Sequence, residues 1–546
     1  MATRVTLKPV PAQDWSPRHA RHLLNRAGFG VPEDRIAKLA MLTPQEAVAV
    51  LLQYRDTPDT LVAPDFLVTF AEYQEFREQV RDLPEEERRR LTNEMQARER
   101  AAILRLQGWW FERMCATPRP LQEKMALFWH GHFATSAQKV KSSQSNYHLN
   151  HLFRDHATGN FKALTTAVGQ SPAMLRYLDN VQNVKGSPNE NWARELMELF
   201  TMGVGHYTED DIKNSARAFT GWGTDGQGAF RFREDQHDFG AKTFFGKTGN
   251  FDGWDIINII FEQPATAEYI AGELWAYLAY ESPEPEIIQP LAAVLRENNY
   301  EIAPLLKAIF TSKAFYSEKA MGTQIKSPAQ FLVQLSSDLA LDSPPYVALA
   351  RASAQLGQNL FYPPNVSGWD GGRQWINANT LLTRYNMSRS IVVADFFEPD
   401  EMSMMDMRAM QGGSMGKAYQ KQFKAALDEA PPEQRKEVRA KMAEAPTPEA
   451  RRAILEDTMI NLEAGRRWNV NAIFGNLNFS TAGECIDALA SRYLNAPLAR
   501  DQKQALLAAI TPSGDADAKV TPETIATDGM TSALHLLFSL AEYQLC

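Results

Sequence analysis

The chain has 546 residues, of which 44% are hydrophobic and 23% are charged. This composition is that of a large globular protein that can bury a sizeable core. The formal net charge of -9 argues against a nucleic-acid surface, because binding phosphates requires clustered Lys and Arg. Three cysteines without a CxxC spacing indicate neither a disulfide framework nor a thiolate zinc site.

The sequence also argues against a membrane protein. Its first residues lack the apolar core of a signal peptide, and no segment approaches the roughly 18 apolar residues that a membrane helix needs. We therefore expect a soluble, cytoplasmic protein without a membrane span. An exported protein whose leader had been removed would give the same sequence.

Helical periodicity and helix-capping residues recur along most of the chain. Helices are predicted at 15–52 with a loop at 28–32, and at 83–115, 120–132, 189–201, 208–222, 265–341 and 534–543. The segments 223–250 and 357–379 are irregular and rich in Gly, Asp, Pro, Asn and Trp. The predicted fold is mostly α: a large multi-helix globular array with long irregular Gly-, Pro- and Trp-rich loops and a small β-hairpin near 228–246.

A change of composition divides the chain into three predicted parts. Residues 1–399 form the main helical body, 400–466 an inserted Met-rich and charged helical arm, and 467–546 C-terminal helices that pack back on the body. Six methionines lie between 402 and 415. Thioethers bind Cu(I), but an adaptable surface loop is the better explanation.

Histidines are concentrated in one part of the body. Seven of the ten histidines lie between positions 130 and 237, and they are His130, His132, His148, His151, His156, His206 and His237. Histidine is the commonest metal ligand and the usual proton carrier near neutral pH. In the motif Phe128 to Phe133, the first two histidines would point about 200° apart on a helix, so one could serve a site and the other the core.

Two carboxylates lie at the margin of an apolar helix face in the segment 189–200. On a helix, Asn191, Glu195 and Glu198 fall at i, i+4 and i+7 and share one face, and Arg194 could pair with Glu198 or Glu190. Carboxylates at the margin of an apolar face are costly to bury unless they are paired or bind a cation. A structural network of ion pairs is the alternative.

These residues predict a metal site on the helices around 128–237. The predicted ligands combine imidazoles with carboxylates, and they are His130, His132, Glu195, His206, His237 and Asp179. Such ligands suit a divalent Zn, Fe or Mn ion better than Cu. Glu195, Glu198 and His132 are the predicted catalytic residues. For Asp179, turn capping is the more common role, and for His206 an exposed position at a C-cap turn is at least as good an explanation as metal ligation.

Several long motifs resemble a known family. The matching segments are Arg21 to Gly30, Lys124 to Phe133, Asn189 to Tyr207, Ala216 to Trp222 and Pro363 to Trp369. On these motifs the chain is identified as a member of the bacterial DUF1800 family, a group without an assigned function. The resemblance implies a mostly α-helical fold, a possible DUF1501-family partner encoded nearby, and export for many members. It supplies no catalytic residue.

Three functions remain open on this basis. The first is a metal-dependent enzyme, hydrolytic or oxidative, in which Asn191 and Arg194 contact substrate. The second is a non-catalytic scaffold or partner of a DUF1501-type protein, in which the polar cluster fixes a helical core. The third is a carbohydrate-binding protein, in which Trp369 and Trp375 stack on sugar rings. The HExxH and P-loop motifs do not occur.

Overall fold

The computed structural model describes residues 7–30, 33–225, 228–341, 344–393, 440, 473–474, 477–511, 513–521 and 528–546. The chain divides into two compact units. Unit 1 comprises Met1–Gln334, Ser353–Ile376 and Leu545–Cys546, and unit 2 comprises Leu335–Ala352 and Asn377–Gln544. The predicted arm 400–466 lies outside the described residues except for residue 440. The three-part division therefore stays a prediction.

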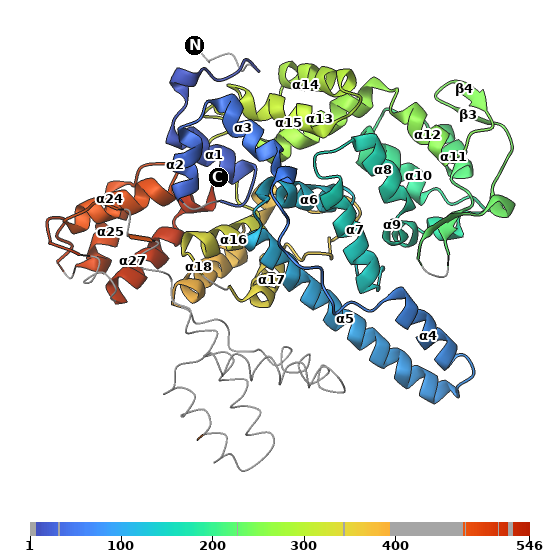
Figure 1. The fold of residues 1–546 in the computed structure, drawn as a ribbon, viewed down its shortest axis with the longest axis horizontal. Helices are drawn as coiled ribbons and strands as arrows, with labels where there is room; N and C mark the ends of the chain where they lie inside the picture. Colours follow the sequence, from blue (N-terminus) through green and yellow to red (C-terminus); the bar gives the residue numbers. More distant parts are fainter. Residues whose placement is uncertain are drawn as a thin grey trace. The chain divides into compact units, whose positions relative to one another are not determined.

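The fold is mostly α, as the sequence predicts (Figure 1). Among its described residues, unit 1 contains fifteen α-helices that lie wholly within it: α1 (Pro17–Arg26), α2 (Glu33–Ala40), α3 (Pro44–Leu52), α4 (Phe70–Val80), α5 (Glu85–Ala116), α6 (Pro120–His132), α7 (Ser143–Asp155), α8 (Phe161–Gln170), α9 (Pro172–Tyr177), α10 (Asn191–Glu195), α11 (Glu209–Ala218), α12 (Gly253–Ile260), α13 (Pro264–Leu278), α14 (Pro285–Glu297) and α15 (Ile302–Thr311). Helices α16 (Pro328–Asp338) and α17 (Tyr346–Gln355) cross the boundary between the units.

Local sequence signals set several helix starts. Thr43 and Glu46 form a capping box at the start of α3, where Pro44 occupies the first turn. Thr208 and Asp211 form another at the start of α11. Each box satisfies backbone N–H groups that the first helical turn leaves unpaired. Both helix starts lie where the sequence predicts them.

Two short antiparallel hairpins interrupt the helices. Strand β1 (Trp222–Thr224) pairs with β2 (Phe230–Phe232), and β3 (Lys242–Phe244) pairs with β4 (Lys247–Gly249). The sequence predicts one hairpin near 228–246, and the strand-like alternation at 230–233 corresponds to β2. The first hairpin begins earlier than predicted because Trp222, at the end of the predicted helix, pairs with Phe232.

A buried carboxylate joins three helices at the centre of unit 1. Glu123 of α6 is fully buried and accepts hydrogen bonds from Trp110 and Arg113 of α5 and from Arg154 of α7. The Arg113 and Arg154 bonds to Oε1 measure 2.9 and 2.5 Å. Burial alone would disfavour the ionised carboxyl, but the two guanidinium groups hold its pKa below the usual range. An ion pair with Asp59 adds a second partner for Arg113.

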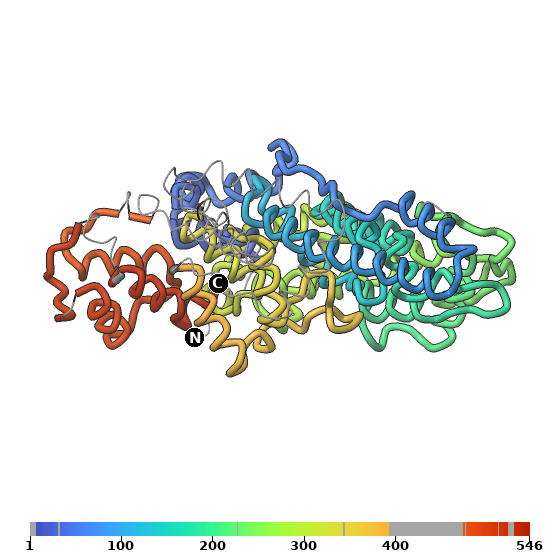
Figure 2. The backbone as a smooth tube through the Cα atoms, turned by 90° about the horizontal axis from the view of Figure 1, so that it is seen from below, coloured from blue at the N-terminus to red at the C-terminus, as the bar shows by residue number. Residues whose placement is uncertain are grey.

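Helix α4 and the first half of α5 form an antiparallel pair that carries few core residues. No side chain of α4 is buried, and the buried residues of α5 begin at Glu99. Glu72, a member of the capping box of α4, forms an ion pair with Arg98 that connects the two helices. Figure 2 shows this pair in blue along the teal segment of α7 to α9.

Unit 2 is a smaller helical unit. Its helices are α18 (Ala378–Val393), α24 (Ala482–Tyr493), α25 (Arg500–Ile510) and α27 (Asp528–Ser539). Helix α27 packs against both α18 and α25. Tyr543 donates a 2.8 Å hydrogen bond to Asp338, which ties the end of this unit to α16.

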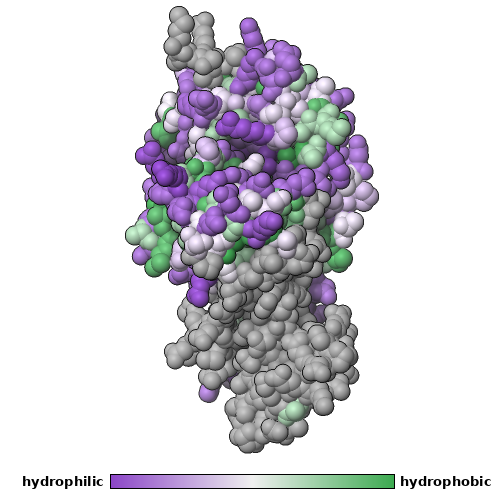
Figure 3. Space-filling model, turned by 90° about the vertical axis from the view of Figure 1, so that its left-hand side faces the viewer, coloured by the Kyte–Doolittle hydropathy of each residue, from purple (hydrophilic) through white to green (hydrophobic). Residues whose placement is uncertain are grey.

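The surface is largely polar. On the face shown in Figure 3, hydrophilic residues cover most of the described surface, and hydrophobic residues form small separate patches. No helix within the described ranges combines the length and the apolar character that crossing a bilayer requires.

We expect Glu123→Gln to lower the free energy of unfolding by about 3–5 kcal/mol, because it leaves the buried Arg154 guanidinium without its counterion and Arg113 with Asp59 alone. Urea unfolding followed by tryptophan fluorescence measures this loss. Glu262→Gln is the matched control, since Glu262 pairs with Lys247 at the surface and should contribute less than about 1 kcal/mol. Equal losses in the two variants would contradict the central role of Glu123.

Candidate functional site

The histidine motif lies on α6, which continues through Gly131 to His132. His130 is buried, and its Nε2 accepts a 3.1 Å hydrogen bond from the backbone N–H of Phe361. Its ring contacts the rings of Trp110 and Phe361. Burial lowers the pKa of His130 to about 3, so the ring is neutral at physiological pH. The nitrogen that faces Phe361 is therefore committed to the backbone.

His132 points away from His130, as expected for i and i+2 on a helix. Its Nε2 donates a 2.9 Å hydrogen bond to the carbonyl of Phe200, and its ring stacks on Phe128. Burial lowers the pKa of His132 to about 4. The two histidines thus connect α6 to two different segments, because the His130 ring bonds to Phe361 and the His132 ring bonds to Phe200.

The Pro- and Gly-rich motif at 363–369 packs against the histidine motif. A Cβ on Gly368 would lie 2.2 Å from the carbonyl oxygen of Gly131, and its φ of +80° also favours glycine. Trp369 contacts the ring of His130, with centroids 5.7 Å apart. These two motifs, far apart in the sequence, therefore form one packed junction.

Helix α10 changes into a π-helical turn at Leu196–Thr201. The wider turn ends with the carbonyls of Leu199 and Phe200, which accept hydrogen bonds from Tyr269 and His132. The sequence predicts a regular helix here, and the π turn is a difference from that prediction. Side-chain donors from α13 and α6 stabilise it by pairing carbonyls that a helix end leaves free.

The two predicted catalytic carboxylates lie near this turn. Glu195 and Glu198 are partly buried, and burial together with the charge of Glu198 raises the pKa of Glu195. The Tyr207 hydroxyl donates a 2.9 Å hydrogen bond to Glu198. Arg194 forms an ion pair with Glu190, one of its two predicted partners. Its second partner is Glu209 and not the other predicted residue, Glu198.

The other predicted ligands lie in separate surroundings. Asp179 has φ 57° and pairs with Lys139 at 2.7 Å. His237 is buried and its Nδ1 lies 2.8 Å from the carbonyl oxygen of Thr220, whereas His206 is exposed. Among the residues that the structure describes, no three His, Cys, Asp or Glu side chains are arranged to hold a metal. Metal binding stays a prediction, without a preformed site in these ranges.

The predicted substrate contacts are also dispersed. Asn191 is exposed at the start of α10, while Trp375 is 8% exposed and Trp369 is partly buried. Both tryptophans pack their rings toward protein groups, near Gly357 and His130 respectively. Binding of carbohydrate at these side chains stays a prediction.

A cavity of about 490 Å³ lies elsewhere in unit 1, between the α4–α5 pair, the segment 137–142 and the end of α9. Its walls combine aromatic, aliphatic and cationic side chains. They are Thr69, Phe70, Tyr73, Phe76, Thr92, Met95, Gln96, Glu99, Arg100, Ile103, Ala137, Gln138, Lys139, Lys141, Ser142, Arg176 and Tyr362.

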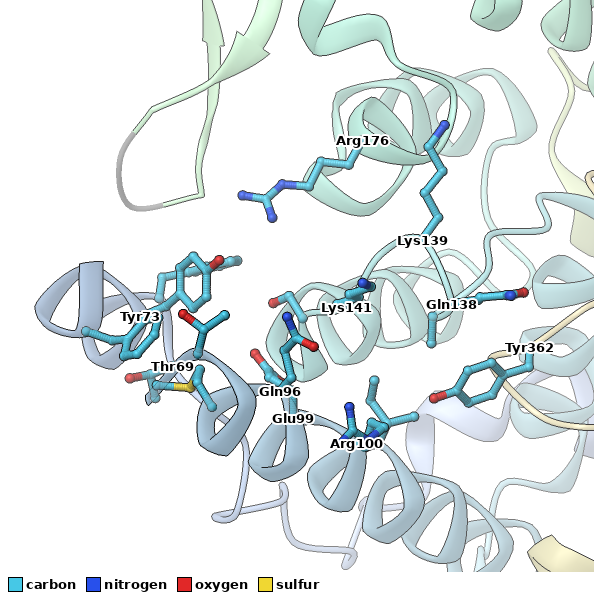
Figure 4. A pocket seen from close by; sticks show the side chains of 17 residues that line it. Thr69, Tyr73, Gln96, Glu99, Arg100, Gln138, Lys139, Lys141, Arg176 and Tyr362 are labelled. Atoms are coloured by element: carbon cyan, nitrogen blue, oxygen red, sulfur yellow. The ribbon is translucent and has the colours of Figure 1, made fainter. Parts of the chain in front are cut away.

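Cations face this cavity from several elements. Figure 4 places Arg176 across the cavity from Gln96 and Arg100 of α5, with Lys141 between them. Arg100, Lys141 and Arg176 form no ion pair within the described part of the chain. All three side chains are exposed, so within the described ranges their charges face solvent and are open to a bound anion.

One strained residue connects the histidine motif to the cavity. Phe361 has φ 65°, which is rare for a bulky side chain. Its N–H donates to His130, and its carbonyl accepts a 2.8 Å hydrogen bond from Ala137, a residue of the cavity wall. The next residue, Tyr362, also lines the cavity. His130 thus helps to position two parts of this wall.

The sequence did not predict this cavity. The polar start of α5 reads as a solvated face, and the cavity residues come from segments that are far apart in the chain. One sequence feature could have indicated it. Aromatic residues recur every three positions in α4, at Phe70, Tyr73 and Phe76, although the helix has few other apolar residues. Only the fold brings them near Lys141 and Arg176.

Comparison with known proteins identifies the family. The sequence matches the family described as "Protein of unknown function (DUF1800)" over residues 22–545. The chain belongs to this family. No curated protein and no solved structure matches it.

We expect the stability of the protein to fall as the pH decreases below 6.5. The folded pKa of His130 is about 3, so the unfolded chain binds more protons between these pH values. From pH 6.5 to 5, this histidine should cost roughly 2 kcal/mol of unfolding free energy. Urea unfolding at several pH values measures this slope.

His130→Gln should show a smaller loss between pH 6.5 and 5, because an amide does not titrate there. His151→Gln is the surface control, since the His151 side chain is exposed. The same slope in all three proteins would contradict the assignment of a buried neutral imidazole.

Proposed function

We propose that the protein binds a small molecule in the cavity between α4, α5 and the segment 137–142. The observation that carries this proposal is the convergence of Arg100, Lys141 and Arg176 on a cavity with an aromatic wall. The volume of about 490 Å³ is within the range of roughly 300–1,000 Å³ that is typical of ligand pockets.

The geometry of the histidine motif supports the same proposal. His130 and His132 bond to backbone groups, and His130 reaches the cavity wall through Phe361. In this account the motif is a structural support for the binding site. That role is close to the scaffold alternative, and a DUF1501-type partner stays a proposal for which the sequence resemblance is the support.

Filling the cavity should abolish binding. Gln96 points into the cavity from α5, and Gln96→Trp would occupy part of its volume. We expect this variant to bind 1-anilinonaphthalene-8-sulfonate or its neutral analogue N-phenyl-1-naphthylamine at least about tenfold more weakly than the parent. Fluorescence titration with stoichiometry measures the affinity.

Asn93→Trp is the matched control, because Asn93 is exposed on the same helix and does not line the cavity. It should bind both probes like the parent protein. If neither probe binds the parent, or if the two tryptophan variants bind alike, the proposed function is wrong.

A metal-dependent enzyme, hydrolytic or oxidative, is the second candidate function. Glu195 and Glu198 favour it, because they are partly exposed, interact with each other and lie beside the Tyr207 hydroxyl. A bound divalent ion would relieve the repulsion between two carboxylates and could activate water.

Elemental analysis of tag-free protein separates the two candidates. The enzyme candidate requires about one metal per chain in the parent protein. The metal should be lost in the double variant Glu195→Gln/Glu198→Gln and retained in the control Glu234→Gln, whose side chain is exposed. The binding account expects less than about 0.1 metal per chain in all three proteins, also after reconstitution. A stoichiometric metal that depends on Glu195 and Glu198 would establish the second candidate.

A further inference from the structure

We propose that the ligand of the α4–α5 cavity is an organic anion: an aromatic or aliphatic body that carries one sulfonate, sulfate, phosphate or carboxylate group. This inference rests on the proposed binding function and adds the chemical class of the ligand. It depends on the charges that face the cavity, on the state of the nearby carboxylates and on the apolar wall.

The cations come from three separate elements. Arg100 is on α5, Lys141 is in the segment before α7, and Arg176 is in the last turn of α9. None of the three has an ion-pair partner in the described ranges, and Figure 4 shows them around the same space. Like charges that converge from different elements repel one another, and an anion bound between them would relieve this repulsion. Arg and Lys side chains bind phosphate and carboxylate groups with strong, charge-assisted hydrogen bonds.

The nearby carboxylates do not neutralise these cations. Glu99 is 5% exposed and accepts a 2.8 Å hydrogen bond from the backbone N–H of Ser143. Burial raises the pKa of Glu99, and its hydrogen bonds to Ser143 act in the opposite direction. Glu72 pairs with Arg98, and Asp179 pairs with Lys139. The excess positive charge therefore belongs to Arg100, Lys141 and Arg176.

The apolar part of the cavity comes from the α4–α5 pair. Phe70, Tyr73 and Phe76 lie along α4, and Met95 and Ile103 lie on α5. No α4 side chain is buried in the protein, and Tyr73 is 39% exposed. A ligand that covered these rings would bury apolar surface that the fold leaves in contact with water. The combination of this wall with three cations matches an amphiphilic anion better than a free inorganic ion.

The surroundings argue against a nucleic acid as the occupant. The cations surround a cavity of about 490 Å³ and do not form a stripe along the surface, whereas the whole chain carries a net charge of -9. A polyanion needs an extended basic surface, and one organic anion does not.

A matched pair of probes tests the class of ligand. The anionic probe is 1-anilinonaphthalene-8-sulfonate, and the neutral probe N-phenyl-1-naphthylamine has the same aromatic body without the sulfonate. We expect Lys141→Met and Arg176→Met each to weaken binding of the anionic probe by about tenfold in the full chain. Binding of the neutral probe should change by less than about twofold. Lys185→Met is the control, because Lys185 is exposed and does not line the cavity.

Displacement of the anionic probe then distinguishes the anionic groups. 1-Naphthyl phosphate, 1-naphthoate and inorganic phosphate are the competitors. The two naphthyl compounds should compete in the parent protein and lose this ability in Lys141→Met, and inorganic phosphate alone should compete only weakly. Binding of the anions should also weaken as the salt concentration rises, because these charges are partly exposed.

Two results would overturn the inference. One is equal or tighter binding of the neutral probe in the parent protein. The other is an effect of Lys141→Met and Arg176→Met no larger than that of Lys185→Met. If Gln96→Trp still blocks the neutral probe in these cases, the binding function stands and only the ligand class is wrong. If Gln96→Trp affects neither probe, the binding function itself fails.

Discussion

The carboxylate of Glu123 is the interaction on which the rest of unit 1 depends. It accepts hydrogen bonds from Trp110, Arg113 and Arg154, and so fixes α6 against α5 and α7. Helix α6 carries the histidine motif, and α5 forms one wall of the cavity. Removing one member of a buried charged network costs more than removing a surface pair, because the remaining charges stay desolvated. The positions of both candidate sites therefore depend on one fully buried residue.

Burial determines which partners the histidine motif has. His130 and His132 are neutral rings that pair with Phe361 and Phe200, and these bonds hold a strained loop residue and the end of a π turn. Backbone groups enclosed away from water need partners, and an imidazole can donate or accept. A motif that suggests metal chemistry in the sequence can thus be retained for the hydrogen bonds that it makes. The half-exposed pair Glu195 and Glu198 is the part of this region where chemistry is still proposed.

The sequence predicted those features that depend on residues close together in the chain. The caps at Thr43 and Thr208 and the mostly helical fold follow from capping and periodicity. The π turn was not predictable, because donors from α6 and α13 create it. The cavity was missed for the same reason: Arg100, Lys141 and Arg176 are separated in the chain and meet only in the fold. Histidine clustering was visible in the sequence, but the direction of each ring was not.

The central claim is that ligand binding occurs at the α4–α5 cavity and not at the histidine and carboxylate motifs. Hydrogen exchange of the full chain with and without 1-anilinonaphthalene-8-sulfonate tests it most directly, because ligand contacts slow local opening. The account predicts slower exchange in residues 92–103 and 137–142, which line the cavity, and no change in 191–207. Protection confined to 191–207, with exchange in 92–103 unchanged, would contradict it.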